Sequence, residues 1–100
     1  MSKPHPLSHL RAEIDALDAE LVKLLARRAR VVERVAAVKA AEALPALIPE
    51  RVEEVVARVK GLAEAEGVDP ALAEAVWRAM IGWFVAFEEK KLAGFPLSRE

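Results

Sequence analysis

Residues 10–39 read LRAEIDALDAELVKLLARRARVVERVAAVK and contain neither proline nor glycine. Apolar side chains recur there at intervals of three and four residues, which is the spacing of one face of an α-helix. Ser8 precedes the run as the expected N-cap. The pattern predicts one helix from residue 10 to about residue 42, roughly 33 residues and about 50 Å long. One arc of its surface gathers the apolar side chains of Leu10, Ile14, Leu17, Leu21, Leu24, Val32 and Val35.

Proline and glycine divide the rest of the chain into two shorter helices. Pro49 suits the first turn of a helix, and Gly67 suits its end. Asp69 and Pro70 form a cap and first-turn pair for a third helix, which should end near Gly94. Without threonine or tyrosine and with only four glycines, the chain has an all-helical composition.

The composition describes a single domain of 100 residues, 54% of them hydrophobic and 31% charged. We expect its core to cover about residues 7–92, with tails at 1–6 and 95–100. A net charge of -1 argues against a protein that holds nucleic acid by bulk charge, and the absence of cysteine excludes disulfides. No apolar run reaches the roughly 18 residues of a membrane span. The first residues also lack a secretory signal, so we expect a cytoplasmic protein.

The long helix is too long for one chain of this size to cover. Two shorter helices can cover one face of it, and its remaining apolar surface needs another partner. We therefore expect a homodimer of three-helix chains.

Two cations, Arg28 and Lys39, lie in the middle of the apolar arc and not on its rim. Buried arginine and lysine are rare unless they are paired, because an unpaired buried charge is costly. One polar residue can fix the register of a helical seam, and long side chains can extend their heads into water. These alternatives explain one cation better than two, so the pattern predicts a site for a small dianion.

Other candidates for this site lie outside the arc. Arg11 is too far along the helix to reach a pocket of its own chain, but in an antiparallel dimer it could reach the partner's pocket; otherwise it is a surface arginine. Arg51 opens the second helix, where an anion also meets a helix N-terminus, or it lies on a solvated flank. His5 and His9 lack spaced partner ligands, so no metal site is expected.

The third helix carries aromatic side chains, and Glu88 lies on the shoulder of their apolar stripe. An apolar environment favours a protonated carboxyl that donates a hydrogen bond, whereas a nearby cation favours a salt bridge, and both outcomes stay open. The apolar stripe is expected to be core or dimer interface first and ligand wall second; it comprises Leu72, Val76, Trp77, Met80, Ile81, Trp83, Phe84 and Phe87.

Over roughly residues 7–92 the chain resembles the all-helical chorismate mutases. The resemblance is carried by the pattern Leu10-Arg11-x-x-Ile14-Asp15-x-Leu17-Asp18-x-x-Leu21-x-x-Leu24-Leu25-x-x-Arg28, by Lys39, by Pro49-Glu50-Arg51 and by the run from Met80 to Glu88. Within that family it looks most like the branch that contains isochorismate-pyruvate lyase. The marks of that branch are Lys39-Ala-Ala-Glu-Ala, Ile48-Pro49-Glu50-Arg51-Val52 and the Ile-x-Trp-aromatic third helix.

The resemblance implies an intertwined three-helix homodimer that converts chorismate to prephenate without a cofactor or a metal. It also implies roles for five side chains. Arg11 of the partner and Arg28 would bind the substrate carboxylates, Lys39 would bond a carboxylate and the ether oxygen, Arg51 would add positive charge, and Glu88 would donate to the ether oxygen.

Three substrate-binding positions depart from the mutase pattern: Ile48, Val52 and Phe84 replace more polar residues. These losses weaken the expected grip on the ring hydroxyl of chorismate. They keep isochorismate-pyruvate lyase, which forms salicylate and pyruvate, as an alternative. A further alternative is a non-catalytic helical dimer that binds a regulatory anion or a partner enzyme. Docking to a larger pathway enzyme is also open, and the pathway itself could be aromatic amino acid or salicylate synthesis.

Overall fold

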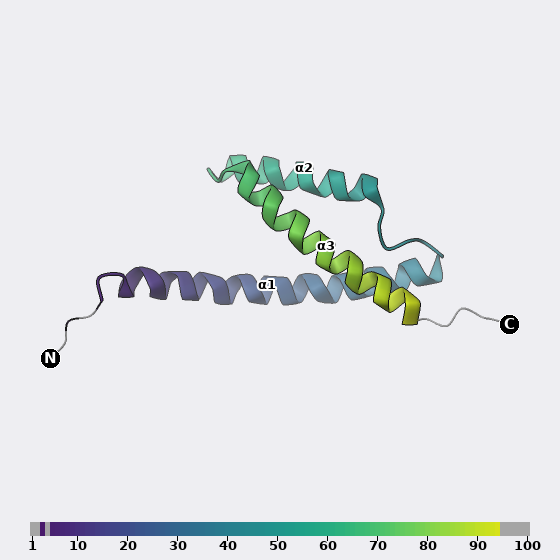
Figure 1. The fold of residues 1–100 in the computed structure, drawn as a ribbon, viewed down its shortest axis with the longest axis horizontal. Coiled ribbons are helices and arrows are strands. Elements are labelled where there is room, and N and C mark those ends of the chain that lie inside the picture. Colours follow the sequence, from purple (N-terminus) through teal and green to yellow (C-terminus); the bar gives the residue numbers. More distant parts are fainter. Residues whose placement is uncertain (1–2, 4, 95–100) are drawn as a thin grey trace. The chain divides into compact units, whose positions relative to one another are not determined.

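The computed structural model describes residue 3 and residues 5–94, and three helices make up most of that part (Figure 1). They are α1 (Ser8–Ala41), α2 (Pro49–Ala65) and α3 (Pro70–Gly94), and the described residues contain no strand. The predicted all-α fold of one long and two shorter helices is confirmed. The expected tail at 95–100 lies outside the described residues. The chain divides into two units, Met1–Val31 and Val32–Glu100.

The N-terminus of α1 differs by one residue from the prediction. The Arg11 N–H donates to the carbonyl of Leu7 over 2.9 Å, so Leu7 occupies the N-cap position and Ser8 is the first helical residue. A turn closed by the Ser8 N–H on the carbonyl of His5, at 2.9 Å, starts the winding early. Nδ1 of His5 accepts the Leu7 N–H over 3.0 Å, which satisfies a donor that precedes the helix.

The turn between α2 and α3 forms as its glycine and aspartate predict. Gly67 has a φ of 76°, a left-handed conformation that costs glycine nothing. The Val68 N–H can therefore reach back to the carbonyl of Ala63 over 2.8 Å and satisfy a free group at the end of α2. The carboxylate of Asp69 accepts the Ala71 N–H over 2.9 Å and caps the start of α3.

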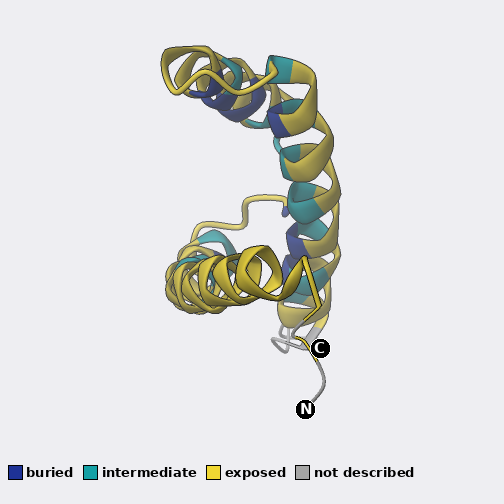
Figure 2. Cartoon of the chain, turned by 90° about the vertical axis from the view of Figure 1, so that its left-hand side faces the viewer, coloured by how far each residue is buried: buried dark blue, intermediate teal, exposed yellow. Residues whose placement is uncertain are grey.

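The described core of the second unit lies between α2 and α3, which contact each other and diverge away from their connecting turn (Figures 1 and 2). Its members are small and β-branched side chains, so the two helices can approach closely. Apolar residues of α2 recur at intervals of four, which places them on the face toward α3. The cluster comprises Val55, Val59, Ala63 and Ala73, with Trp77 and Ile81 packed against it.

Charged side chains also join α2 to α3 on the surface. Arg78 donates to both carboxylate oxygens of Glu53, at 3.0 and 2.9 Å, and to Glu74 at 2.8 Å. Lys60 adds a contact to Glu74 at 3.3 Å. Hydrogen bonds and charge from Arg78 lower the pKa of Glu53 below its usual 4.5, and Arg78 and Lys60 do the same for Glu74.

This network makes part of the stability depend on pH. A carboxyl whose pKa falls on folding stabilises the folded state above its unfolded pKa, and that contribution is lost as pH falls through the folded pKa. We expect Arg78→Leu to lower Tm at neutral pH, with the difference from wild type shrinking below about pH 4. Arg58→Leu, at another exposed arginine, is the control. A difference that persists unchanged in acid would contradict the assignment.

The end of α1 requires a left-handed residue that is not glycine. Ala43 has a φ of 57°, and its N–H donates to the carbonyl of Ala40 over 3.4 Å. The Leu44 N–H donates to the carbonyl of Lys39 over 2.8 Å, which completes the helix end. An alanine in this conformation costs roughly 1–2 kcal/mol because Cβ crowds the following carbonyl.

Ala43→Gly is therefore expected to raise the free energy of unfolding by about 1 kcal/mol, measured by urea unfolding at fixed protein concentration. Ala37→Gly is the matched control, since this exposed alanine lies inside α1 and glycine there should destabilise by about 1 kcal/mol. Equal losses in both variants would show that the turn at residue 43 stores no strain.

Most of α1 in the first unit is exposed (Figure 2). Its exposed residues include the apolar positions of the predicted arc, among them Leu17 at 63% and Leu21 at 61%. Exposed apolar residues that share one helix face are typical of an interaction site. In the described part of the chain, no helix is long and apolar enough to cross a membrane.

Candidate active site

Lys39 is the best-anchored predicted site residue. It lies in the last turn of α1, and its side chain is only 14% exposed. Its Nζ donates to the main-chain carbonyl of Ala46 over 2.7 Å and to Oε1 of Glu88 over 2.8 Å. Both bonds have the short length of charge-assisted hydrogen bonds. A cation in the apolar arc has thus found acceptors on α3 and on the α1–α2 connection.

Glu88 is the buried acid of α3, with a side chain 9% exposed. It makes the salt bridge that the sequence offered as one of two possibilities, at 2.8 Å from Nζ of Lys39. A lone carboxylate at this depth would be costly, and Lys39 supplies the compensating charge. The Lys39 ammonium could donate to an anionic ligand in place of Glu88. The Glu88 carboxyl could also form a hydrogen bond with a ligand bound beside the pair.

Arg51, Ile48 and Val52 lie together where α2 begins. Ile48 occupies the N-cap position without a side-chain cap, and both Ile48 and Val52 are half-buried. Arg51 is exposed and donates to Glu54 on the next turn over 2.6 Å. The solvated flank considered for Arg51 is therefore its state in this structure. A ligand would have to compete with Glu54 for it.

The aromatic side chains of α3 divide between two faces. Phe84 is 6% exposed and lies one turn before Glu88, so an apolar ring borders the carboxylate. Trp83 is 63% exposed and packs edge-on against Phe84 at 5.1 Å and stacked on Phe87 at 5.7 Å. The exposed face also carries Leu72 and Val76. The apolar stripe predicted for this helix thus has one side in the core and one side that is exposed.

Arg11 and Arg28 belong to the first unit. Arg11 is exposed, as a residue that serves a neighbouring subunit would be, whereas Arg28 is half-buried on α1. Their roles toward a substrate stay predictions.

The sequence missed the main-chain carbonyl of Ala46, a buried residue at 6% exposure, which accepts a hydrogen bond from Lys39. Every residue carries such a carbonyl, so no side-chain pattern can reveal which one folds over a cation. Pro45 marks only a turn in this connection.

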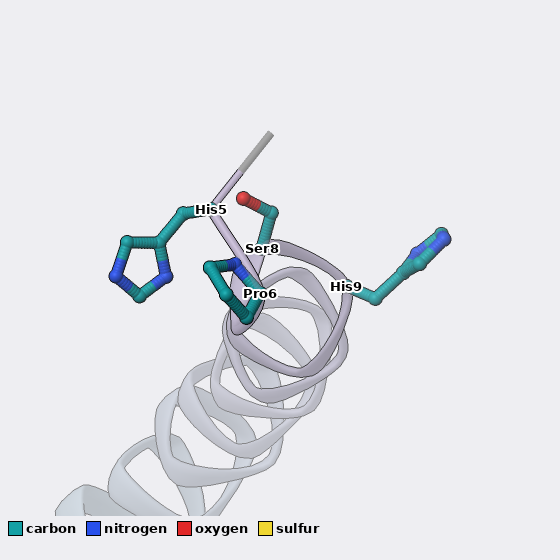
Figure 3. Close-up of a pocket in the computed structure, with 4 residues that line it drawn as sticks. All are labelled: His5, Pro6, Ser8 and His9. Carbon is teal, nitrogen blue, oxygen red and sulfur yellow. The ribbon is translucent and has the colours of Figure 1, made fainter. Parts of the chain in front are cut away.

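A hollow at the start of α1 is lined by His5, Pro6, Ser8 and His9 (Figure 3). The two imidazole rings project to opposite sides of the helix start, so they cannot share a ligand as placed. Among the described residues, no cluster of three or more His, Cys, Asp or Glu side chains could hold a metal ion.

The model of the family chorismate mutase type II matches residues 10–89, and this chain belongs to that family. The match covers all three helices, including the turn of α1 that carries Lys39 and the turn of α3 that carries Glu88. The family predicted from the pattern of residues 10–39 is confirmed.

The chain is similar both to parts of longer proteins and to a relative of about its own length. It is 41% identical over 75 residues to the T-protein of Enterobacter agglomerans, covering 75% of this chain and 20% of that protein. It is 34% identical over 85 residues to the isochorismate pyruvate lyase of Pseudomonas aeruginosa, covering 84% of this chain and 82% of the lyase.

A bifunctional chorismate mutase/prephenate dehydratase of Aquifex aeolicus is 33% identical over 87 residues, which cover 84% of this chain and 24% of that protein. The chain thus spans about a fifth of the T-protein's length and most of the lyase's. The lyase match agrees with the predicted proximity to the lyase branch.

Proposed function

We propose that this protein is a chorismate mutase, an isomerase that rearranges chorismate to prephenate. The observation that carries the proposal is the part-buried Lys39 side chain, 14% exposed and held by Glu88 at 2.8 Å in a chain of the chorismate mutase type II family. A reaction that builds negative charge on an ether oxygen needs a fixed cation in a site that excludes water.

The mechanism uses binding and charge and forms no covalent intermediate with the protein. Arg28 and the partner's Arg11 hold the two carboxylates and fold the substrate into its reactive conformer. As the ether C–O bond breaks and the new C–C bond forms, Lys39 and protonated Glu88 bond the ether oxygen and stabilise its developing charge. Ile48, Arg51, Val52 and Phe84 complete the substrate-binding wall.

The proposed working form is a homodimer. The arc of α1 leaves Leu10 and Ile14 each 55% exposed, and the outer face of α3 leaves Trp83 63% exposed. A second copy carries the same faces and can cover them in a two-fold arrangement. Antiparallel long helices would also bring Arg11 of one chain to the pocket of the other. Docking of this dimer to a larger pathway enzyme stays a prediction.

Isochorismate-pyruvate lyase activity is the second candidate. The Pseudomonas aeruginosa lyase is matched over 82% of its length, so it is a relative of about this chain's size. Val52 and Phe84 also offer no hydrogen bond to a ring hydroxyl. The same cations would hold isochorismate while pyruvate is eliminated.

Product analysis tests the proposal. Purified protein is incubated separately with chorismate and with isochorismate, and products are identified by chromatography. Prephenate from chorismate with little salicylate from isochorismate supports the mutase. Efficient salicylate formation replaces it with the lyase, and turnover of neither substrate favours a non-catalytic dimer that binds an anion or a partner enzyme.

The shared pocket predicts complementation between two inactive variants. Arg11→Ala and Lys39→Ala homodimers should each be nearly inactive. A hybrid dimer has one pocket with both defects and one pocket with neither, so mixed chains should recover about a quarter of wild-type activity if exchange is statistical. The measurement is chorismate turnover after co-refolding, with hybrids counted by native mass spectrometry. Confirmed hybrids without recovery would rule out a pocket shared between subunits.

A further inference from the structure

The connection between α1 and α2 forms hydrogen bonds with two groups of Lys39, its main-chain carbonyl and its side-chain ammonium. The Leu44 N–H donates to the main-chain carbonyl of Lys39 over 2.8 Å, and Lys39 Nζ donates to the carbonyl of Ala46 over 2.7 Å. Ala46 itself is 6% exposed. The connection therefore folds over the lysine and buries the group that meets its ammonium.

We propose that the main-chain carbonyl of Ala46 is a positioning group that holds the Lys39 ammonium in place for the reaction. The inference rests on the proposed function and adds to it a group that no side chain supplies. Lysine reaches its site through a flexible four-carbon stem, so one acceptor leaves the ammonium free to swivel. A second acceptor from a different segment removes that freedom before the substrate arrives.

The chemistry of the two acceptors gives them different tasks. Glu88 is charged in its contact with Lys39, and in the proposed mechanism it must carry a proton to donate to the ether oxygen. The main-chain carbonyl of Ala46 is not ionisable, so it can accept the hydrogen bond from Lys39 whether or not Glu88 carries a proton. It is also neutral, so it fixes the ammonium without cancelling its positive charge. An ammonium has three N–H donors, and these two acceptors leave one for a substrate oxygen.

The test weakens this carbonyl without changing a side chain. Chemical synthesis of the full chain can replace the Ala46–Leu47 amide with an ester, whose carbonyl is a weaker acceptor. The matched control places the ester at the Val68–Asp69 bond in the turn between α2 and α3, since neither the Val68 carbonyl nor the Asp69 N–H has a hydrogen-bond partner among the described residues. A synthetic all-amide chain is the reference.

We expect the 46–47 ester to lower kcat for chorismate by about tenfold, with KM within about twofold, because the substrate still binds but its cation is loosely held. The 68–69 ester should stay within about twofold of the all-amide chain in both constants. Equal losses in the two esters would overturn the proposal, and so would a raised kcat, which would mean that the Ala46 carbonyl competes with substrate.

A second measurement needs no variant. Coupling through the hydrogen bond, between ¹⁵Nζ of Lys39 and the ¹³C carbonyl of Ala46, should be detected by NMR in unmodified protein and should persist with prephenate bound. Its absence in either state would overturn the proposal even if the ester fails to fold. An all-amide chain that turns over neither substrate would instead reject the proposed function, whereas normal turnover by the 46–47 ester rejects only the role of Ala46.

Discussion

Lys39→Ala is expected to lower kcat/KM for chorismate by about 10³-fold, because the reaction loses the cation that faces the developing charge on the ether oxygen. The same change leaves Glu88 buried without its partner and the Ala46 carbonyl without its donor. Breaking a buried ion pair in this way costs about 3 kcal/mol of stability. Steady-state kinetics and urea unfolding measure the two effects separately.

Lys60→Ala is the matched control. Lys60 also pairs with a glutamate, Glu74, but its side chain is 43% exposed, and loss of such a pair should cost at most about 1 kcal/mol and leave turnover intact. A Lys39→Ala/Glu88→Ala chain should regain part of the lost stability, since it removes the stranded charge. It should remain inactive. Near-normal turnover by Lys39→Ala with a persistent dimer would reject the catalytic assignment of Lys39.

Glu88→Gln is expected to remove most of the pH dependence of turnover. If only the protonated carboxyl donates to the ether oxygen, the wild-type rate falls as pH rises and Glu88 loses its proton. Glutamine donates through its amide at every pH, and its carbonyl can still accept from Lys39. The rate of the variant should therefore stay nearly constant with pH, whereas that of the wild type falls as pH rises.

The measurement is kcat/KM from about pH 5 to about pH 8. Glu89→Gln, at the exposed neighbour of Glu88, should reproduce the wild-type profile. A wild-type rate that is flat across this range would contradict the donor role. The 2.8 Å salt bridge would then be the working state of Glu88, with Lys39 alone facing the ether oxygen.

The helices could be read from the sequence because their signals are local. Gly67 is the residue that a left-handed helix end prefers, and Asp69 bonds the N–H two residues ahead of it. The first residue of α1 was harder to predict. A turn closed by the Ser8 N–H on the carbonyl of His5 moves the N-cap to Leu7, one residue before the predicted cap, and helix ends are commonly uncertain by one or two residues.

The family and the importance of Lys39 could also be predicted from the sequence, since a lysine at the centre of an apolar helical arc must find an anion or a carbonyl. The residues that Lys39 contacts could be predicted only in part. Glu88 stood out because it lies on the shoulder of the aromatic stripe of the third helix, yet its protonated and paired states were equally consistent with the pattern. The tertiary structure, which brings Oε1 of Glu88 to 2.8 Å from Nζ of Lys39, shows the pair.

The sequence of this chain determined three helices, their ends, the apolar arc of α1 and the cations within it, because propensity, capping and periodicity act over a few residues. The tertiary structure decided which long-range partners those cations meet. Lys39 joins Glu88 from 49 residues away, and a left-handed turn at Ala43 brings the carbonyl of Ala46 over the ammonium. Such contacts depend on the path of the whole backbone and on main-chain groups that every residue shares.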